Sequence, residues 1–226
     1  MKELRFNPFH QIHQALRALM YHVSVTTQHT DFTDEAQAEK TLSLTESMVH
    51  FFEGHANTED SLVFPMLAES SPRLIAYFEE QHVKDHELGE ELTKAIRECR
   101  EARTPVEKTL AGQGLQRAIG GFVAFNLTHM NLEETMVLPA LWDQYTDEQL
   151  HSKEAEIVAS LSPEKKAFSG YWMLKGLATH EIIGWFTSIR ANAPSFVFDE
   201  FVQLAERALP ADKLRAVQKA LGLSLA

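Results

Sequence analysis

The chain has 226 residues, 44% hydrophobic and 23% charged, so it is long and apolar enough to bury a substantial core. Its formal net charge of −11 argues against nucleic acid or an anionic membrane as the partner. The start of the chain has no apolar signal segment, and no apolar run approaches the length of a membrane span. The single cysteine, Cys99, excludes an internal disulfide framework. We therefore expect a cytoplasmic protein without membrane partners.

Four prolines that follow good N-cap residues mark helix starts along the chain, because proline is tolerated at the first helical position. Between these starts, apolar residues recur at three- and four-residue spacing. They predict helices near residues 8–29, 34–68, 72–102 and 105–144. Short connections make neighbouring helices antiparallel, so we predict an all-α, up-down-up-down four-helix bundle over residues 1–144.

Residues 145–226 predict a second helical region that is rich in aromatic side chains. The expected helices lie near 147–160, 163–192, 195–208 and 211–222. No linker composition separates this region from the bundle. We expect a helical C-terminal extension that packs on the bundle or on a second subunit, the latter giving a homodimer.

An internal repeat links the second and fourth predicted helices. The segment 55–65 (HANTEDSLVFP) aligns without gaps on 129–139 (HMNLEETMVLP), with five of eleven positions identical. Each copy holds a histidine, a glutamate four residues later and a proline at a fixed distance, and such a proline ends or kinks its helix. The repeat predicts that two His–Glu pairs lie at the same height in the bundle.

Residues four apart lie on one helix face, so each such pair offers two ligands to a common point. The chain has three of these pairs: His55 with Glu59, His129 with Glu133, and His82 with His86. The first helix adds His13, with His10 and His22 as competitors that depth along the bundle does not separate. In an antiparallel bundle all these positions approach one layer.

Seven polar ligands in a bundle core favour a metal, and seven exceed the need of one ion. Two six-coordinate ions that share both carboxylates and a bridging oxygen would keep one position open for a diatomic ligand. An imidazole-rich set with carboxylates suits iron, with manganese or zinc as substitutes.

These residues resemble the hemerythrin (HHE cation-binding) family in its bacterial form, over roughly residues 8–144. The similarity lies in the repeated His-x3-Glu-(Asp/Glu)-x4-Pro signature and in the segment from His13 to Arg17. The resemblance implies a non-haem di-iron centre, and favours His13 over the other first-helix histidines. The implied ligands are His13, His55, Glu59, His82, His86, His129 and Glu133. Some members use a carboxylate one residue later, here Glu134, but the internal repeat favours Glu133.

We therefore predict a di-iron protein that binds or senses O2 or NO at an open iron site. The resemblance also implies proteins of iron homeostasis or iron-centre repair. A separate alternative is an enzyme that uses the same centre, such as an oxidase, peroxidase or NO reductase, but we expect a binding or sensing protein over an enzyme. A ferritin-like site would need two Glu-x-x-His pairs in bundle helices, and the second such pair, Glu148 with His151, follows a predicted helix junction. The zinc-protease pattern fails at His180, because Gly184 stands where the second histidine is required.

Overall fold

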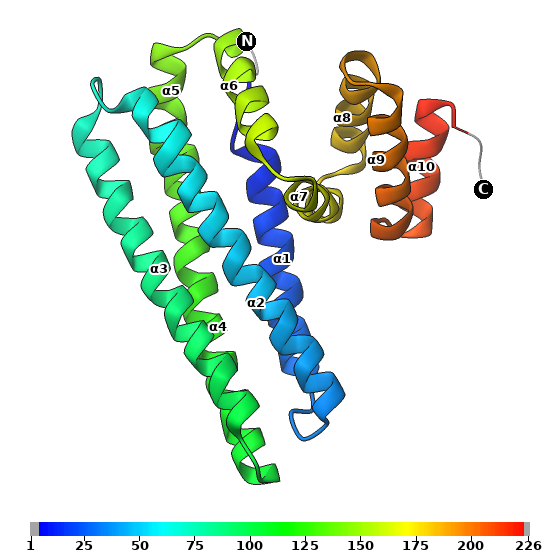
Figure 1. The fold of residues 1–226 in the computed structure, drawn as a ribbon. Helices are drawn as coiled ribbons and strands as arrows, with labels where there is room; N and C mark the ends of the chain where they lie inside the picture. Colours follow the sequence, from blue (N-terminus) through cyan, green and yellow to red (C-terminus); the bar gives the residue numbers. More distant parts are fainter. Residues whose placement is uncertain (1–4, 224–226) are drawn as a thin grey trace. The chain divides into compact units, whose positions relative to one another are not determined.

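The computed structural model describes residues 5–223, and over that range every regular element is helical. The predicted all-α class is confirmed (Figure 1). The long helices are α1 (His10–His29), α2 (Glu35–Thr58), α3 (Pro72–Glu101) and α4 (Pro105–Leu132). The shorter ones are η1 (Glu59–Val63), η2 (Phe64–Leu67), η3 (Glu133–Val137), α5 (Leu138–Gln144), α6 (Asp147–Ser160), α7 (Pro163–Gly176), α8 (Thr179–Asn192), α9 (Ser195–Ala208) and α10 (Ala211–Leu221).

Side chains cap the starts of α2 and α4, and the cap before Pro105 is one of the predicted signals. The Asp34 side chain accepts hydrogen bonds from the Ala36 and Gln37 N–H groups at the start of α2. Thr104 and Glu107 form a reciprocal capping box at the start of α4, directly before and after Pro105. These caps satisfy N–H groups that a helix leaves without an internal partner, which fixes where each helix begins.

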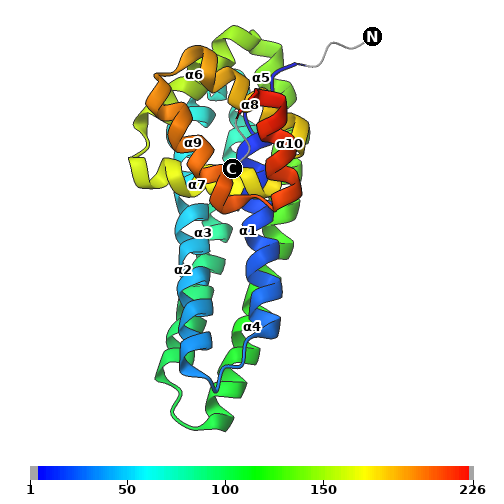
Figure 2. The ribbon, with the colours of Figure 1, turned by 90° about the vertical axis from the view of Figure 1, so that its right-hand side faces the viewer.

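The chain divides into two compact units. One comprises the residues up to Asn7 together with Leu19–Ile157, and the other comprises Pro8–Ala18 together with the residues from Val158 onward. In the first unit α2, α3 and α4 run alongside one another (Figures 1 and 2), with contacts between α2 and α3 and between α3 and α4.

The core of the first unit is built from regularly spaced apolar side chains. Phe52 of α2 meets Phe122 of α4 edge to face, with ring centroids 5.0 Å apart. On the surface, Arg100 of α3 binds two carboxylates of α2, Glu39 and Glu46. The helices are thus joined by apolar packing inside and by an ion-pair network outside.

The second unit has its own apolar core. Its fully buried members include Leu174, Ile182 and Phe186. The predicted single helix over 163–192 is divided in the structure into α7 and α8. At the break, the Ala178 N–H donates to the Glu181 carboxylate, which begins α8.

Close packing inside the second unit requires a glycine at the end of α7. A Cβ atom at Gly176 would lie 2.2 Å from the backbone oxygen of Gln14, so no larger residue fits there without a shift of backbone. No helix among the described residues is long and apolar enough to cross a membrane.

Candidate metal centre

Both copies of the internal repeat leave the regular α-helical hydrogen-bond pattern at their glutamate. η1 and η3 are π-helical, with the Phe64 N–H donating to the backbone carbonyl oxygen of Glu59 and the Leu138 N–H donating to that of Glu133. The next residue in each copy is a proline, which has no N–H to donate and whose ring clashes with the carbonyl four residues earlier. The ladder therefore slips by one residue, a feature that is frequent at functional sites.

The two glutamates at these π-turns are buried. Glu59 is 2% exposed and Glu133 is fully buried. His55 Nε2 lies 3.3 Å from Glu59 Oε1, and His129 Nε2 lies 3.1 Å from Glu133 Oε1. The structure therefore brings together the members of these two i,i+4 pairs.

His82 of α3 lies between the two glutamates. Its Nε2 is 3.4 Å from Glu59 Oε2 and 3.9 Å from Glu133 Oε1. That nitrogen is buried and makes no hydrogen bond within residues 5–223. A buried imidazole nitrogen aimed at two buried carboxylates is costly unless a cation stands between them.

The ligand atoms form two groups that share both glutamates. Glu59, His82, His129 and Glu133 each offer one atom within 4.8 Å of the others, and His55 offers one within the same distance of both carboxylates. Imidazole nitrogens with carboxylate oxygens form a donor set for iron, manganese or zinc. Each group could therefore hold a cation, and Glu59 and Glu133 belong to both groups.

The second ring nitrogen of two of these histidines is bonded to a neighbouring side chain. His82 Nδ1 lies 2.7 Å from Asp60 Oδ1, and His129 Nδ1 lies 2.8 Å from Gln81 Oε1. Phe64 stacks on the His82 ring at a centroid distance of 5.2 Å. Each ring is thus fixed in orientation, with Nε2 directed to the carboxylates.

A further buried carboxylate lies one turn along α3. Asp85 is 6% exposed, and the Asn126 side-chain N–H donates to its Oδ1 at 2.6 Å. Burial raises the pKa of this carboxyl, while the Asn126 hydrogen bond opposes the rise. Asp85 is not among the residues predicted from the sequence, although it follows the three- and four-residue spacing of the buried face of α3.

The structure does not bring His86, the second predicted histidine of α3, to the cluster. Its side chain is 62% exposed and lies 3.6 Å from Glu90 on the surface of α3. The buried positions of the helix include Phe78, His82, Asp85 and Gly89, which alternate steps of four, three and four. The next polar position on that face after His82 is therefore Asp85, and His86 lies beside the face.

The remaining predicted alternatives are separated by burial. Of the first-helix histidines, His13 is fully buried, whereas His22 is exposed and His10 is bonded to Glu181. Glu133 belongs to the ligand groups, whereas Glu134 is only half-buried and belongs to neither.

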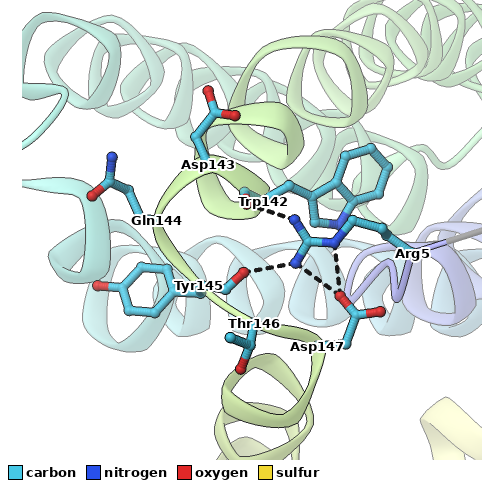
Figure 3. A pocket seen from close by; sticks show the side chains of 7 residues that line it. All are labelled: Arg5, Trp142, Asp143, Gln144, Tyr145, Thr146 and Asp147. Atoms are coloured by element: carbon cyan, nitrogen blue, oxygen red, sulfur yellow. Dashed lines mark hydrogen bonds and ion pairs between the residues drawn. The ribbon is translucent and has the colours of Figure 1, made fainter. Parts of the chain in front are cut away.

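A surface pocket near the junction of α5 and α6 is not a competing site. Figure 3 shows Arg5 among the residues that line it, from Trp142 to Asp147. The Arg5 guanidinium donates to the Asp147 carboxylate and to the Trp142 and Tyr145 carbonyl oxygens. Its charge is thus used to attach the N-terminal segment to this junction.

Comparison with known families gives one clear match. The profile of the hemerythrin HHE cation binding domain matches residues 6–141. This range contains the internal repeat and every residue of the buried cluster. Searches among curated proteins and among solved structures gave no match.

Proposed function

Because the chain belongs to the hemerythrin HHE cation-binding family, we propose that the buried cluster holds two iron ions and that the protein binds or senses O2 or NO there. The observation that carries this proposal is that two groups of ligand atoms share Glu59 and Glu133. Two shared carboxylates hold two cations close together. Manganese or zinc would fit the same donors.

Each residue of the cluster has a proposed role. Glu59 and Glu133 bridge the ions, His82 and His129 bind one of them, and His55 binds the other. We retain His13 as the first-helix ligand, because it is buried and lies in the segment that is similar to bacterial hemerythrins. We also retain the up-down-up-down order of the bundle and the cytoplasmic location as proposals.

With His86 outside the cluster, the protein supplies fewer donors than the sequence suggested. Four imidazoles and four carboxylate oxygens fill eight of about twelve positions on two six-coordinate ions. A bridging oxygen would take two more, so two positions stay open instead of one. NO titration of the reduced protein should then reach two per chain.

When bound, the ion pair supplies ligand binding and electron transfer to a diatomic molecule. The chain's own part is to orient the imidazoles and to exclude water. Phe64 stacks on His82, and Phe125 stacks on His129 at a centroid distance of 5.9 Å. The two phenylalanine rings thus cover one face of each of the two imidazoles with apolar surface.

A second candidate function is a di-iron enzyme, such as an NO reductase, an oxidase or a peroxidase. The absence of His86 from the cluster favours an enzyme, because two open coordination positions on the metals would admit two small ligands side by side. Iron homeostasis or iron-centre repair would use the same donors. Sustained turnover with NO or peroxide would favour the enzyme over a binding protein.

The test is metal content and the absorption spectrum of anaerobically reduced protein, before and after O2 or NO. Two irons per chain with bands that reverse on deoxygenation would support reversible binding, whereas rapid irreversible oxidation would support a sensor or an enzyme. The Glu59→Ala variant should lose metal, and His50→Ala, an exposed histidine on the same helix, should keep it. Wild-type protein without stoichiometric metal would contradict the proposal.

A further inference from the structure

We propose that Asp60 and Gln81 are positioning residues that make His82 a stronger metal donor than His129. This inference rests on the proposed metal centre and concerns the two histidines that would bind the same ion. The Nδ1 atoms of these histidines have hydrogen-bond partners of different charge. The partner of His82 is the Asp60 carboxylate, and the partner of His129 is the neutral Gln81 amide.

The hydrogen bonds fix which ring nitrogen faces the metal position. The Asp60 and Gln81 atoms that bond to the rings are oxygens, which accept and do not donate. When Nε2 binds a metal, each imidazole therefore donates its Nδ1 proton to the neighbouring side-chain oxygen. Those Nε2 atoms are the ones that lie 3.4 Å from Glu59 and 3.1 Å from Glu133.

Asp60 and Gln81 are each adjacent in sequence to a proposed metal ligand. Asp60 directly follows Glu59 in the π-turn η1, so two consecutive residues approach the two nitrogens of His82 from opposite edges of the ring. Gln81 directly precedes His82 on α3 and reaches the ring of His129 on α4. α3 thus supplies one ligand and the partner of another.

The two bonds differ in strength because one acceptor is charged. A hydrogen bond to an ionised acceptor is roughly twice as strong as a neutral one. It draws the Nδ1 proton toward the carboxylate and increases electron density at Nε2, which strengthens the bond to a metal and stabilises the more oxidised ion. The Gln81 amide fixes the ring of His129 without this electronic effect.

The experiment compares Asp60→Asn, Gln81→Glu and their combination with the control Glu80→Gln. Glu80 is an exposed acid on α3 beside Gln81, so its variant also removes one negative charge but contacts no ligand histidine. Three quantities are measured: iron affinity by chelator competition, the reduction potential of the iron pair, and the exchangeable Nδ1–H signals of the cobalt(II)-substituted protein by NMR. Far-ultraviolet circular dichroism checks that each variant is folded.

Asp60→Asn should lower iron affinity by roughly 10- to 100-fold and raise the reduction potential. Gln81→Glu should lower the potential, and the combined variant should return it toward the wild-type value while the two N–H signals exchange their shifts. Glu80→Gln should change affinity less than about twofold, since an exposed charge is screened.

Two outcomes would overturn the inference: one would leave the proposed metal centre in place, and the other would also contradict it. If Asp60→Asn matches Glu80→Gln while both retain two irons, Asp60 acts only as a surface charge and the metal centre stands. If the wild-type protein binds no stoichiometric metal, the proposed function fails and this inference fails with it. Gln81→Glu tests the same point independently if Asp60→Asn does not fold.

Discussion

Replacing His82 should remove a metal from the protein, whereas replacing His86, one turn later on the same helix, should not. The i,i+4 spacing makes the two histidines equal candidates, but the structure separates them by burial. The side chain of His82 is 6% exposed and faces both glutamates, while that of His86 is 62% exposed and faces Glu90. The pair of alanine variants therefore tests the orientation of α3 directly.

The expected magnitudes follow from these surroundings. The contact of His86 with Glu90 lies on the surface and is an ion pair only when the imidazole is protonated, so His86→Ala should change the free energy of unfolding by no more than about 1 kcal/mol. His82→Ala removes a donor and leaves a hole beside Phe64. A tenfold loss of metal affinity corresponds to about 1.4 kcal/mol of stabilisation by the bound metal, and loss of a direct ligand should cost at least that.

Both variants would be reconstituted anaerobically with iron, desalted and analysed for metal content, and their thermal unfolding compared with and without iron. We expect His86→Ala to hold two irons and to gain as much stability from them as the wild type does. His82→Ala should hold one iron or none. Loss of metal from His86→Ala, with His82→Ala unaffected, would mean that α3 presents its other edge to the cluster and would refute the reasoning.

Further predictions concern the first unit as a whole. Gly114→Ala should raise the free energy of unfolding by about 0.5–1 kcal/mol, because a Cβ there meets nothing and alanine favours the helix. Gly112→Ala should lower it, because the new Cβ would lie 2.3 Å from the Phe32 ring, and overpacking costs about 1–3 kcal/mol; urea denaturation of both variants gives the sign. Arg100 lowers the pKa of its two glutamate partners, so their stabilising effect is present at neutral pH and is lost as pH falls through their folded-state pKa. Arg100→Ala should therefore cost about 1 kcal/mol or less at pH 7, and the difference from the wild type should shrink as the pH falls below the ordinary glutamate pKa and vanish once both carboxyls are protonated, as chemical unfolding at several pH values would show.

The sequence was sufficient to predict those residue pairs of the candidate site that depend only on spacing along one helix. His55 with Glu59 and His129 with Glu133 are fixed by the geometry of a single turn, and the internal repeat indicates that they belong together. The all-α class follows in the same way from periodicity and from proline and cap residues. Such features depend on neighbours in the chain, and these are visible without a structure.

The sequence was insufficient where lateral packing decides. Spacing alone does not say which edge of a helix turns inward, and for α3 the steps of three and four along its buried face select Asp85 over His86. Likewise, Pro65 and Pro139 could each end a helix, kink it or shift its hydrogen bonds, and only the packed helix shows that they follow π-turns. The hydrogen bonds of Asp60 and Gln81 with the ligand imidazoles join residues on different helices, so no local sequence pattern predicts them.

In the proposed metal centre, α3 and not the repeat would set the number of open metal positions. The repeat makes the second and fourth helices equivalent: each supplies one imidazole and one shared carboxylate. α3 has no counterpart to this motif, and its second histidine points to solvent while a carboxylate, Asp85, occupies the inward position one turn from His82. A rotation that brought His86 inward would carry Asp85 away from Asn126, which donates to it in the core. Because leaving a buried polar group without its hydrogen bond costs about 1–3 kcal/mol, the Asp85–Asn126 hydrogen bond favours the orientation of α3 that keeps His86 out of the cluster.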